Sequence, residues 1–506
     1  MRACHPDCVL VTASQMRAIE ETLFRNGLPV AALMEKVVIR VVQRLMSWIP
    51  KGQTIGLLAG PGHNGADTLA IGRELWLQGY AVRIYHPFAQ AKELTLAHRN
   101  YAHYLGIPFV ETAQELANCD VLIDGLFGFG LEKDLTPALV ELIHTVNAWK
   151  KTVISIDLPS GLHTDTGQPQ PIAVQATCTL CLGLWKVGLF LEAAQPYVGQ
   201  LERIDLDIPQ ATVATALGDA PTVYRLTAPA MLQALPLPRP TVTHKYHCGH
   251  LLLVCGSRTY AGAAVLSALG ARASGVGMLS VAVPQSLQWL ITSHTPEALV
   301  IPCPETDAGA IAELPVELDK YDFIAVGPGL TLAAQPVVQR LWQSDKPLLA
   351  DADALNLLAP WSQNRAAWTL MTPHAGEFQR LFPDLSLTNR LQAAQTAAQM
   401  AQATVVLKGA KTLIAQPDGT VAINSESTPG LARGGSGDVL TGLLGGLLAQ
   451  GVKQQRDLFA LVQAGVWWHA QTGVWLAQRE SELSVHPQQL AQHLGTVLGN
   501  LLRDGA

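Results

Sequence analysis

A glycine-rich stretch late in the chain places one carboxylate among main-chain donors. It reads Leu431-Ala-Arg-Gly-Gly-Ser-Gly-Asp438 and continues into an apolar run. The pattern predicts a loop that turns into a buried helix, with the N–H groups of Gly435, Ser436 and Gly437 free at its start. Such a helix start binds anions, because its donors and its dipole point the same way. Asp438 could then act as a general base toward a hydroxyl as a phosphoryl group arrives. The alternative is a glycine turn with Asp438 as an ordinary first-turn charge.

Polar stretches in the first half could form a second site. Gly60-Pro-Gly-His-Asn-Gly-Ala-Asp67 follows the strand-like run 54–59, and Asp124 and Asp157 each end an apolar, β-rich run. The carboxyl ends of parallel strands meet at one edge of a sheet, where open α/β sheets bind ligands. We therefore expect the three stretches to converge. Helix-capping aspartates in βα turns are the alternative reading for each residue taken singly.

A basic stretch in the C-terminal half of the chain could help the glycine-rich loop to bind phosphate. Lys408, Lys411 and Thr412 follow the apolar run 404–407. A lysine and backbone amides at a strand end can hold a nucleotide phosphate or ribose, although a solvated turn is an equal alternative. No P-loop of the GxxxxGK[ST] kind is present, so that phosphate-binding solution is not in use.

Hydrophobic periodicity predicts the elements that position these residues. Two helices are expected within 12–46, broken at Gly27-Leu-Pro29, and a further helix from about Thr68 to Gln78. A strand at 81–85 completes a βαβ unit. After residue 207 the pattern restarts, and strands are expected at 251–255, 278–283, 323–326, 348–350 and 404–407, with a small-residue helix at 263–274.

Length and composition limit the class of protein. The chain has 506 residues, 49% of them hydrophobic and 15% charged, with a net charge of −6. We expect two compact α/β domains, perhaps three, with no nucleic-acid or membrane partner. No signal-peptide core begins the chain, so a cytoplasmic location is expected. The uncharged segment 458–478 contains three Gln, a His and a Thr, which favours a buried helix over a membrane span.

Two groups of cysteines and histidines invite a metal interpretation. Cys178 and Cys181 have CxxC spacing within a β-rich run, and His244, His247 and His250 are three residues apart. No second ligand pair stands at zinc-finger spacing from either group. Structural roles are therefore the prediction for both.

The amino-acid composition of the chain changes between its two halves. Residues 211–220 are rich in Ala and Thr, and three prolines follow at 236, 238 and 240. Such a segment suits an interdomain connector. We predict an N-terminal Rossmann-like parallel-sheet domain at 1–217 and a second α/β domain at 218–506.

These residues carry a family resemblance over nearly the whole chain. The chain resembles the bifunctional NAD(P)H-hydrate repair enzymes, and its second half resembles their ribokinase-like dehydratase domain. The stretches that carry the first-domain resemblance are 12–17, 33–35, 60–67, 124–130 and 157–161; those that carry the second are 244–246, 255–257, 327–329, 351–353, 372–374, 408–412 and 434–438.

The resemblance implies two activities. The first domain would interconvert the R and S forms of NADHX and NADPHX, the hydrated nicotinamide cofactors. The second would dehydrate the S form to NAD(P)H at the expense of ADP, with Mg²⁺ and K⁺ as ions and a homo-oligomer as the expected assembly. The alternative is a ribokinase-type small-molecule kinase fused to a non-catalytic binding domain.

The resemblance also assigns site residues. In the first domain the hydrate would be held by His63, Asn64, Gly65, Ala66, Asp67, Gly128, Phe129, Gly130, Leu131, Glu132, Lys133, Asp134 and Asp157. Potassium would be bound by Asn64, Asp124 and Ser160. In the second domain Ala263, Gly329, His374 and Asp438 would face the hydrate, and Lys408, Gly409, Ala410, Lys411, Thr412 and Gly437 would hold the nucleotide.

Chemical logic agrees with these assignments. Hydroxide is a poor leaving group, and phosphorylation of the C6 hydroxyl would make it a good one. Asp438 would deprotonate that hydroxyl while the adjoining amides stabilise the transferring phosphoryl group. Asp157 would be the epimerase acid/base, or would only position the substrate. His63, Ala66 and Thr68 depart from the family's usual Asn, Gly and Gly, and the methyl group of Ala66 is expected to shift the backbone of the cofactor loop.

Overall fold

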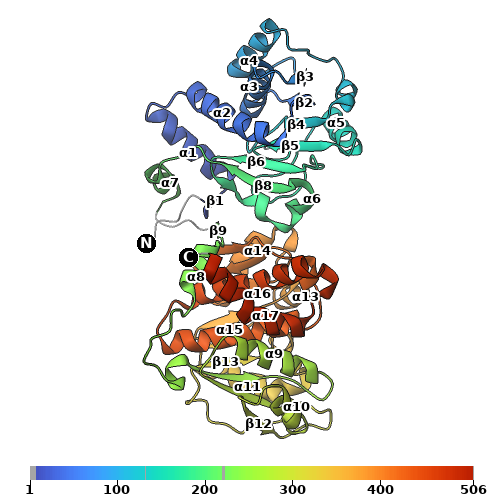
Figure 1. The fold of residues 1–506 in the computed structure, drawn as a ribbon. Coiled ribbons are helices and arrows are strands. Elements are labelled where there is room, and N and C mark those ends of the chain that lie inside the picture. Colours follow the sequence, from blue (N-terminus) through green and yellow to red (C-terminus); the bar gives the residue numbers. More distant parts are fainter. Residues whose placement is uncertain (1–6, 132, 219–222, 505–506) are drawn as a thin grey trace. The chain divides into compact units, whose positions relative to one another are not determined.

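The chain forms two compact α/β units, Met1–Val223 and Tyr224–Ala506. The computed structural model describes residues 7–131, 133–218 and 223–504. Figure 1 shows the elements of both units.

The first unit is built on a six-stranded parallel sheet in the order β3-β2-β4-β5-β6-β8. A second, two-stranded sheet pairs β1 with β7. The strands are β1 (Leu10–Val11), β2 (Thr54–Ala59), β3 (Ala81–Tyr85), β4 (Val121–Gly125), β5 (Thr152–Ile156), β6 (Cys178–Leu182), β7 (Trp185–Lys186) and β8 (Gln200–Ile204). The helices are α1 (Ala13–Arg25), α2 (Val30–Trp48), α3 (His63–Leu77), α4 (Glu93–Tyr104), α5 (Pro137–Ala148), α6 (Gln195–Val198) and α7 (Gln210–Leu217).

Apolar side chains cover both faces of this sheet. One core joins the strands to α2 and α3 through residues such as Val41, Leu69 and Ile123. The other joins them to α5 through Leu142, Ile143 and Val153. Burial on both faces explains why the strands read as continuous apolar runs, and the arrangement leaves the carboxyl ends of the strands for the site.

The second unit is built on a ten-stranded sheet in the order β12-β11-β10-β13-β14-β15-β16-β17-β18-β9. The strands from β12 to β16 are parallel, and β16, β17 and β18 form antiparallel pairs. The strands are β9 (Val223–Arg225), β10 (His250–Val254), β11 (Met278–Pro284), β12 (Leu299–Cys303), β13 (Phe323–Val326), β14 (Leu348–Ala350), β15 (Thr369–Met371), β16 (Thr404–Leu407), β17 (Thr412–Ala415) and β18 (Val421–Asn424). The helices are α8 (Ala228–Ala234), α9 (Ala261–Ala273), α10 (Gln288–His294), α11 (Gln335–Trp342), α12 (Asp353–Leu357), α13 (Ala375–Leu381), α14 (Arg390–Ala401), α15 (Ser436–Lys453), α16 (Leu458–Arg479) and α17 (Pro487–Asp504).

The glycine-rich helix α15 lies at the centre of the second core. Glycines let it approach its neighbours closely: a Cβ at Gly442 would lie 1.9 Å from the carbonyl oxygen of Ser267 on α9. Leu443 and Leu447 pack in the same core as Leu251 of β10 and Phe323 of β13. The position of the loop before α15 is therefore fixed by the core beneath it.

The predicted two-domain α/β architecture with parallel sheets is confirmed. The break between α1 and α2 falls at Asn26–Pro29, as the sequence indicated. Two local expectations were wrong. Helix α3 begins at His63, not near Thr68, and Thr412 begins the antiparallel strand β17.

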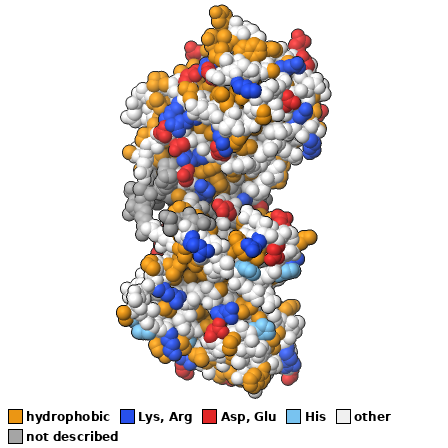
Figure 2. Space-filling view, viewed as in Figure 1, with side chains coloured by type: hydrophobic (Ala, Val, Ile, Leu, Met, Phe, Trp, Pro, Cys, Tyr) orange, Lys and Arg blue, Asp and Glu red, His pale blue; other side chains and the backbone are white. Residues whose placement is uncertain are grey.

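The surface and the uncharged helix agree with the composition. Figure 2 shows Lys and Arg side chains interspersed with Asp and Glu side chains over the face in view. Residues 458–478 lie in α16, most of whose residues are buried. Within the described parts of the chain, no helix is long and apolar enough to cross a membrane.

The cysteines and histidines flagged in the sequence lie in ordinary structural positions. Cys178 and Cys181 are buried free thiols on β6, and burial raises the pKa of each to about 11. His244 and His247 stack on each other, and His250 begins β10. The described residues contain no group of three or more His, Cys, Asp or Glu side chains placed to hold a metal ion.

Candidate functional sites

The loop after β2 is held against the loop after β4 by direct backbone contact. A Cβ at Gly60 would lie 1.7 Å from the carbonyl oxygen of Leu126, and one at Gly65 would lie 1.8 Å from that of Gly60. The N–H of Gly60 donates to the carbonyl of Gly125 at 3.1 Å. Only glycine fits these positions, so the packing brings the start of α3 to the end of β4.

Asp124 links the loops that follow β4 and β5. Its fully buried carboxylate accepts hydrogen bonds from the Ser160 hydroxyl at 2.6 Å, the Ser160 N–H at 2.9 Å, the Ser155 hydroxyl at 2.8 Å and the Leu126 N–H at 3.3 Å. Burial nevertheless raises its pKa above the ordinary value.

Asp157 is the central carboxylate of the first site. It follows β5 with a φ of +69°, a strained conformation for a residue other than glycine. Its Oδ1 accepts from the Lys186 Nζ at 2.5 Å and the Leu182 N–H at 3.3 Å, and its Oδ2 accepts from the Phe129 N–H at 3.0 Å. Lys186 is only 1% exposed. Because every partner is a donor, the hydrogen bonds suit the ionised carboxylate.

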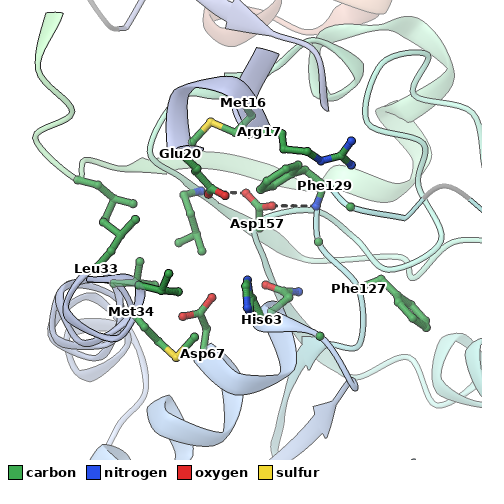
Figure 3. A pocket seen from close by; sticks show the side chains of 18 of the residues that line it. Met16, Arg17, Glu20, Leu33, Met34, His63, Asp67, Phe127, Phe129 and Asp157 are labelled. Atoms are coloured by element: carbon green, nitrogen blue, oxygen red, sulfur yellow. Dashed lines mark hydrogen bonds between the residues drawn. The ribbon is translucent and has the colours of Figure 1, made fainter. Parts of the chain in front are cut away.

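Asp157 and Lys186 line a cavity of about 500 Å³ at the carboxyl ends of the strands. Figure 3 shows Glu20 and Asp157 on one side of it and His63 and Asp67 on the other. Apolar side chains from α1 and α2, among them Met16, complete the wall. Cavities of this size and mixed lining are typical of small-molecule sites.

Two carboxyl groups in the cavity favour their protonated forms. Burial, with the nearby charge of Asp157 opposing the effect of Lys186, raises the pKa of Glu20 to about 7. Burial and the charges of Asp157, Glu20 and Glu35 raise the pKa of Asp67 well above its ordinary value. Burial also lowers the pKa of His63. The cavity thus combines the hydrogen-bonded carboxylate of Asp157 with two carboxyl groups that burial makes harder to ionise.

The structure places most of the first-domain residues at this cavity. The predicted residues that line it are His63, Asn64, Asp67, Gly128, Phe129, Gly130, Leu131 and Asp157. Gly65 and Ala66 are buried in α3 and do not line it. Lys133 and Asp134 are exposed and also lie outside the lining, and Glu132 falls outside the described residues. Ala66 belongs to the first turns of α3.

Sequence reasoning missed two charged residues of this site. Lys186 could have been noticed as a single charge within the apolar run 178–191. Glu20 gave no local signal, since it lies on an amphipathic helix with many polar neighbours. Both reach the cavity through long-range packing.

The second site is centred on the start of α15. Gly435 caps the helix with a φ of +97°, and Asp438 lies in the first turn. Contrary to expectation, the N–H of Ser436 is engaged, because it donates to the carbonyl of Arg433 at 3.3 Å. Among the hydrogen bonds of the described residues, none uses the N–H of Gly435 or Gly437. Two free donors therefore remain beside Asp438.

A lysine completes the cradle at this helix start. Lys408 Nζ lies 3.5 Å from where a Cβ of Gly437 would be. Asp351 fixes the position of the lysine side chain. One of its carboxylate oxygens accepts from Lys408 at 2.8 Å and the other from the Thr441 hydroxyl at 2.6 Å. Glu377 lies 3.9 Å from the same Nζ. The arrangement fixes a positive charge beside free main-chain donors.

Asp438 lies close enough to Asp351 and Lys408 for their charges to act on it. Burial and the charge of Asp351, opposed by Lys408, raise its pKa to about 7. A carboxylate with this pKa is suited to taking a proton near neutral pH.

The other predicted residues of the second site fall in several places. Ala263 and Gly329 meet, since a Cβ at Gly329 would lie 2.9 Å from that of Ala263. His374 caps α13, with a side chain 56% exposed, and its ring lies 3.4 Å from Glu377. Lys408, Gly409 and Ala410 follow β16, whereas Lys411 donates to the carbonyl of Ser425, beyond the end of β18. The hydroxyl of Thr412 donates back to Gly409.

Both halves of the chain match known protein families. Residues 30–188 match the family described as YjeF-related protein N-terminus, and residues 251–495 match NAD(P)H-hydrate dehydratase. Proteins named bifunctional NAD(P)H-hydrate repair enzyme from Thermosynechococcus vestitus and Synechocystis are 51% and 50% identical, covering 96% of this chain and 96% and 94% of theirs. A Bacillus subtilis ADP/ATP-dependent NAD(P)H-hydrate dehydratase structure is 30% identical, with a TM-score of 0.48, covering 56% of this chain and 98% of that one.

The two units and their sites define a two-site α/β enzyme, with a carboxyl-lined cavity in one unit and, in the other, Asp438 and Lys408 beside the free N–H groups at the start of α15. The chain belongs to the family of bifunctional NAD(P)H-hydrate repair enzymes.

Proposed function

We propose that the two sites divide the repair of hydrated nicotinamide cofactors between them. The first unit interconverts the R and S forms of NADHX and NADPHX, and the second dehydrates the S form to NAD(P)H with ADP as the phosphoryl donor. The observation that carries the second assignment is Asp438, which lies with a raised pKa among the free N–H groups of α15.

In the second site the chain's residues supply a base and positive charge. Asp438 takes the proton of the C6 hydroxyl as the phosphoryl group arrives. Lys408 and the N–H groups of Gly435 and Gly437 stabilise charge on the transferring oxygens. Once phosphate is attached at C6 it leaves readily, and the lone pair of the ring nitrogen drives the elimination.

Nucleotide and Mg²⁺ are assigned to the same cradle. Lys408, Gly409, Ala410, Lys411, Thr412 and Gly437 would hold ADP, and Mg²⁺ would neutralise its phosphates. The fixed ammonium of Lys408 beside Gly437 fits a phosphate. Ala263, Gly329, His374 and Asp438 would face the hydrate.

In the first site Asp157 is assigned a charge-stabilising role. Its oxygens are occupied by three donors, so it accepts hydrogen bonds and has no proton of its own to give. A fixed negative charge there stabilises the cation that forms when hydroxide leaves C6. This supports the positioning alternative for Asp157 over a role as the acid.

Potassium fits the loop junction of the first unit. The side-chain amide of Asn64 donates to the carbonyl of Ile156 at 3.1 Å, while its buried Oδ1 has no partner among the described residues. An unpaired buried acceptor suits a monovalent cation. Asn64, Asp124 and Ser160 would hold the ion and brace the loops.

Unfolding temperatures in K⁺ and in a bulky organic cation should then differ, and Asn64→Ala should remove the difference.

The dehydratase assignment is tested with purified (6S)-NADHX and each nucleotide in turn. With ADP, the absorbance of reduced nicotinamide should return, and without nucleotide it should not. A stable phosphorylated product without NADH would instead identify a small-molecule kinase.

A further inference from the structure

Helix α1 forms one wall of the first cavity although it precedes the family-matched residues 30–188. A capping box at Thr12 and Gln15 fixes its start, and the Ala13 N–H donates to Asp165 at 2.7 Å. Met16 and Ile19 are buried in a core with Leu184. This anchoring holds Glu20, one turn after Met16, in a defined position on the cavity wall.

Glu20 and Asp67 face the cavity from opposite sides. Figure 3 shows Glu20 entering from α1 beside Asp157, and Asp67 rising from α3 across the open space. Both are lining residues, and Glu20 lies close enough for its charge to act on Asp67. The charged groups that face Glu20 from other elements are Lys186, Asp157 and Lys92, with Arg17 on its own helix.

Inversion at C6 requires proton transfer on both faces of the nicotinamide ring. The hydroxyl leaves one face as water and must receive a proton there. A water molecule returns to the other face and must lose one. A single group on one side cannot do both, so a two-sided site is needed.

We propose that Asp67 and Glu20 are the acid and base of the epimerase, acting on opposite faces of the ring at C6. This rests on the epimerase activity proposed above. Asp67 protonates the departing hydroxyl, the C6–O bond breaks, and the lone pair of the ring nitrogen forms the C6=N bond. Water attacks C6 from the side of Glu20, which takes its proton. The net change is one inverted centre and one proton moved from Asp67 to Glu20.

The reverse reaction starts from the exchanged state. Glu20 then donates and Asp67 accepts, so one shared proton serves both directions and the pair titrates as a unit. Burial raises the pKa of both carboxyl groups, so either of them can hold the proton in the cavity. Asp157, held by Lys186, stabilises the iminium cation.

The test uses the full-length protein and the purified R epimer without nucleotide. Glu20→Gln and Asp67→Asn should each slow R-to-S exchange by about 100-fold or more, since general acid–base catalysis contributes that much. ADP-dependent dehydration of the S epimer, which takes place in the other unit, should be unchanged in both variants, and their unfolding temperatures should show that the first unit is folded. Glu141→Gln, on the exposed face of α5, is the matched control and should exchange at the wild-type rate.

Two further readouts separate chemistry from structure. In heavy-oxygen water each inversion should place one solvent oxygen at C6, and retention of the original oxygen would overturn the mechanism. The wild-type kcat/KM for exchange should rise with pH through about 7 as Glu20 loses its proton, and Glu20→Gln should lose that dependence. If Glu20→Gln or Asp67→Asn exchanged the epimers at a rate within about twofold of wild type, the acid–base roles of the pair would be overturned. Absence of exchange in the wild type would overturn the epimerase assignment itself.

Discussion

Asp438 and Asp351 lie in the same site, yet their surroundings give them different tasks. Asp351 accepts from Lys408 and Thr441, so its oxygens are occupied in aiming the lysine. Asp438 is half-buried with Asp351 and Glu377 nearby, and its pKa rises to about 7. The same cluster therefore contains a fixed positioning carboxylate and an adjustable base.

Replacing Asp438 tests this division at the residue scale. Asp438→Asn should keep nucleotide affinity but lower the kcat of dehydration by about 100-fold or more, because only the proton acceptor is lost. The measurement is NADH recovery from the S hydrate with ADP, beside a binding titration with ADP. Asp384→Asn, at an exposed position outside the site, is the control. Dehydration at the wild-type rate by Asp438→Asn would remove the proposed base.

The raised pKa of Asp438 also has a consequence for stability. The carboxyl ionises near 3.8 when unfolded and near 7 when folded, so between these values the folded state binds more protons. Stability is then lost as pH rises from about 4 to about 7 and stays lost above that. Asp438→Asn should raise the unfolding temperature, and by more at about pH 8 than at about pH 5. Calorimetry that finds the same increment at both pH values would contradict the burial argument.

At the scale of elements, the first site depends on the close approach of α3 to the loops beside it. A methyl group at Gly65 would lie 1.8 Å from the carbonyl oxygen of Gly60, so backbone must move. Gly65→Ala should therefore lower the unfolding temperature of the first unit and abolish R/S exchange. Gly62→Ala adds a methyl group that meets nothing within 4 Å and should leave the unfolding temperature unchanged. Equal unfolding temperatures for the two variants would show that the loop is not tightly packed.

Element boundaries show where sequence reasoning fails. The strand ends at Asp124 and Asp157 were predictable because apolar β-rich runs stop there. The start of α3 was not, because glycine and polar residues between His63 and Asp67 are typical of a loop. Tertiary contact overrides that preference, since the polar first turn faces the cavity and glycine permits the approach to Gly60. Strand β17 was missed because only its antiparallel pairing with β16 and β18 reveals it.

At the scale of the whole molecule, sequence patterns could predict two α/β units and the stretches that converge in each. They could not predict which charges pair. Lys186 and Asp157 are 29 residues apart, and no local pattern joins them. Glu20 enters through a helix far earlier in the chain. Pairings of this kind follow from three-dimensional packing, and in the first unit they decide which carboxyl groups carry protons.

The two proposed sites in one chain should act in series on a mixture of epimers. The most direct measurement supplies equal amounts of R- and S-NADHX with excess ADP and follows the final yield of NADH. The wild-type enzyme should convert the whole mixture, whereas Glu20→Gln should stop after consuming the S half and Asp438→Asn should form little NADH. A wild-type reaction that leaves the R epimer untouched, or yields no NADH with ADP, would contradict it.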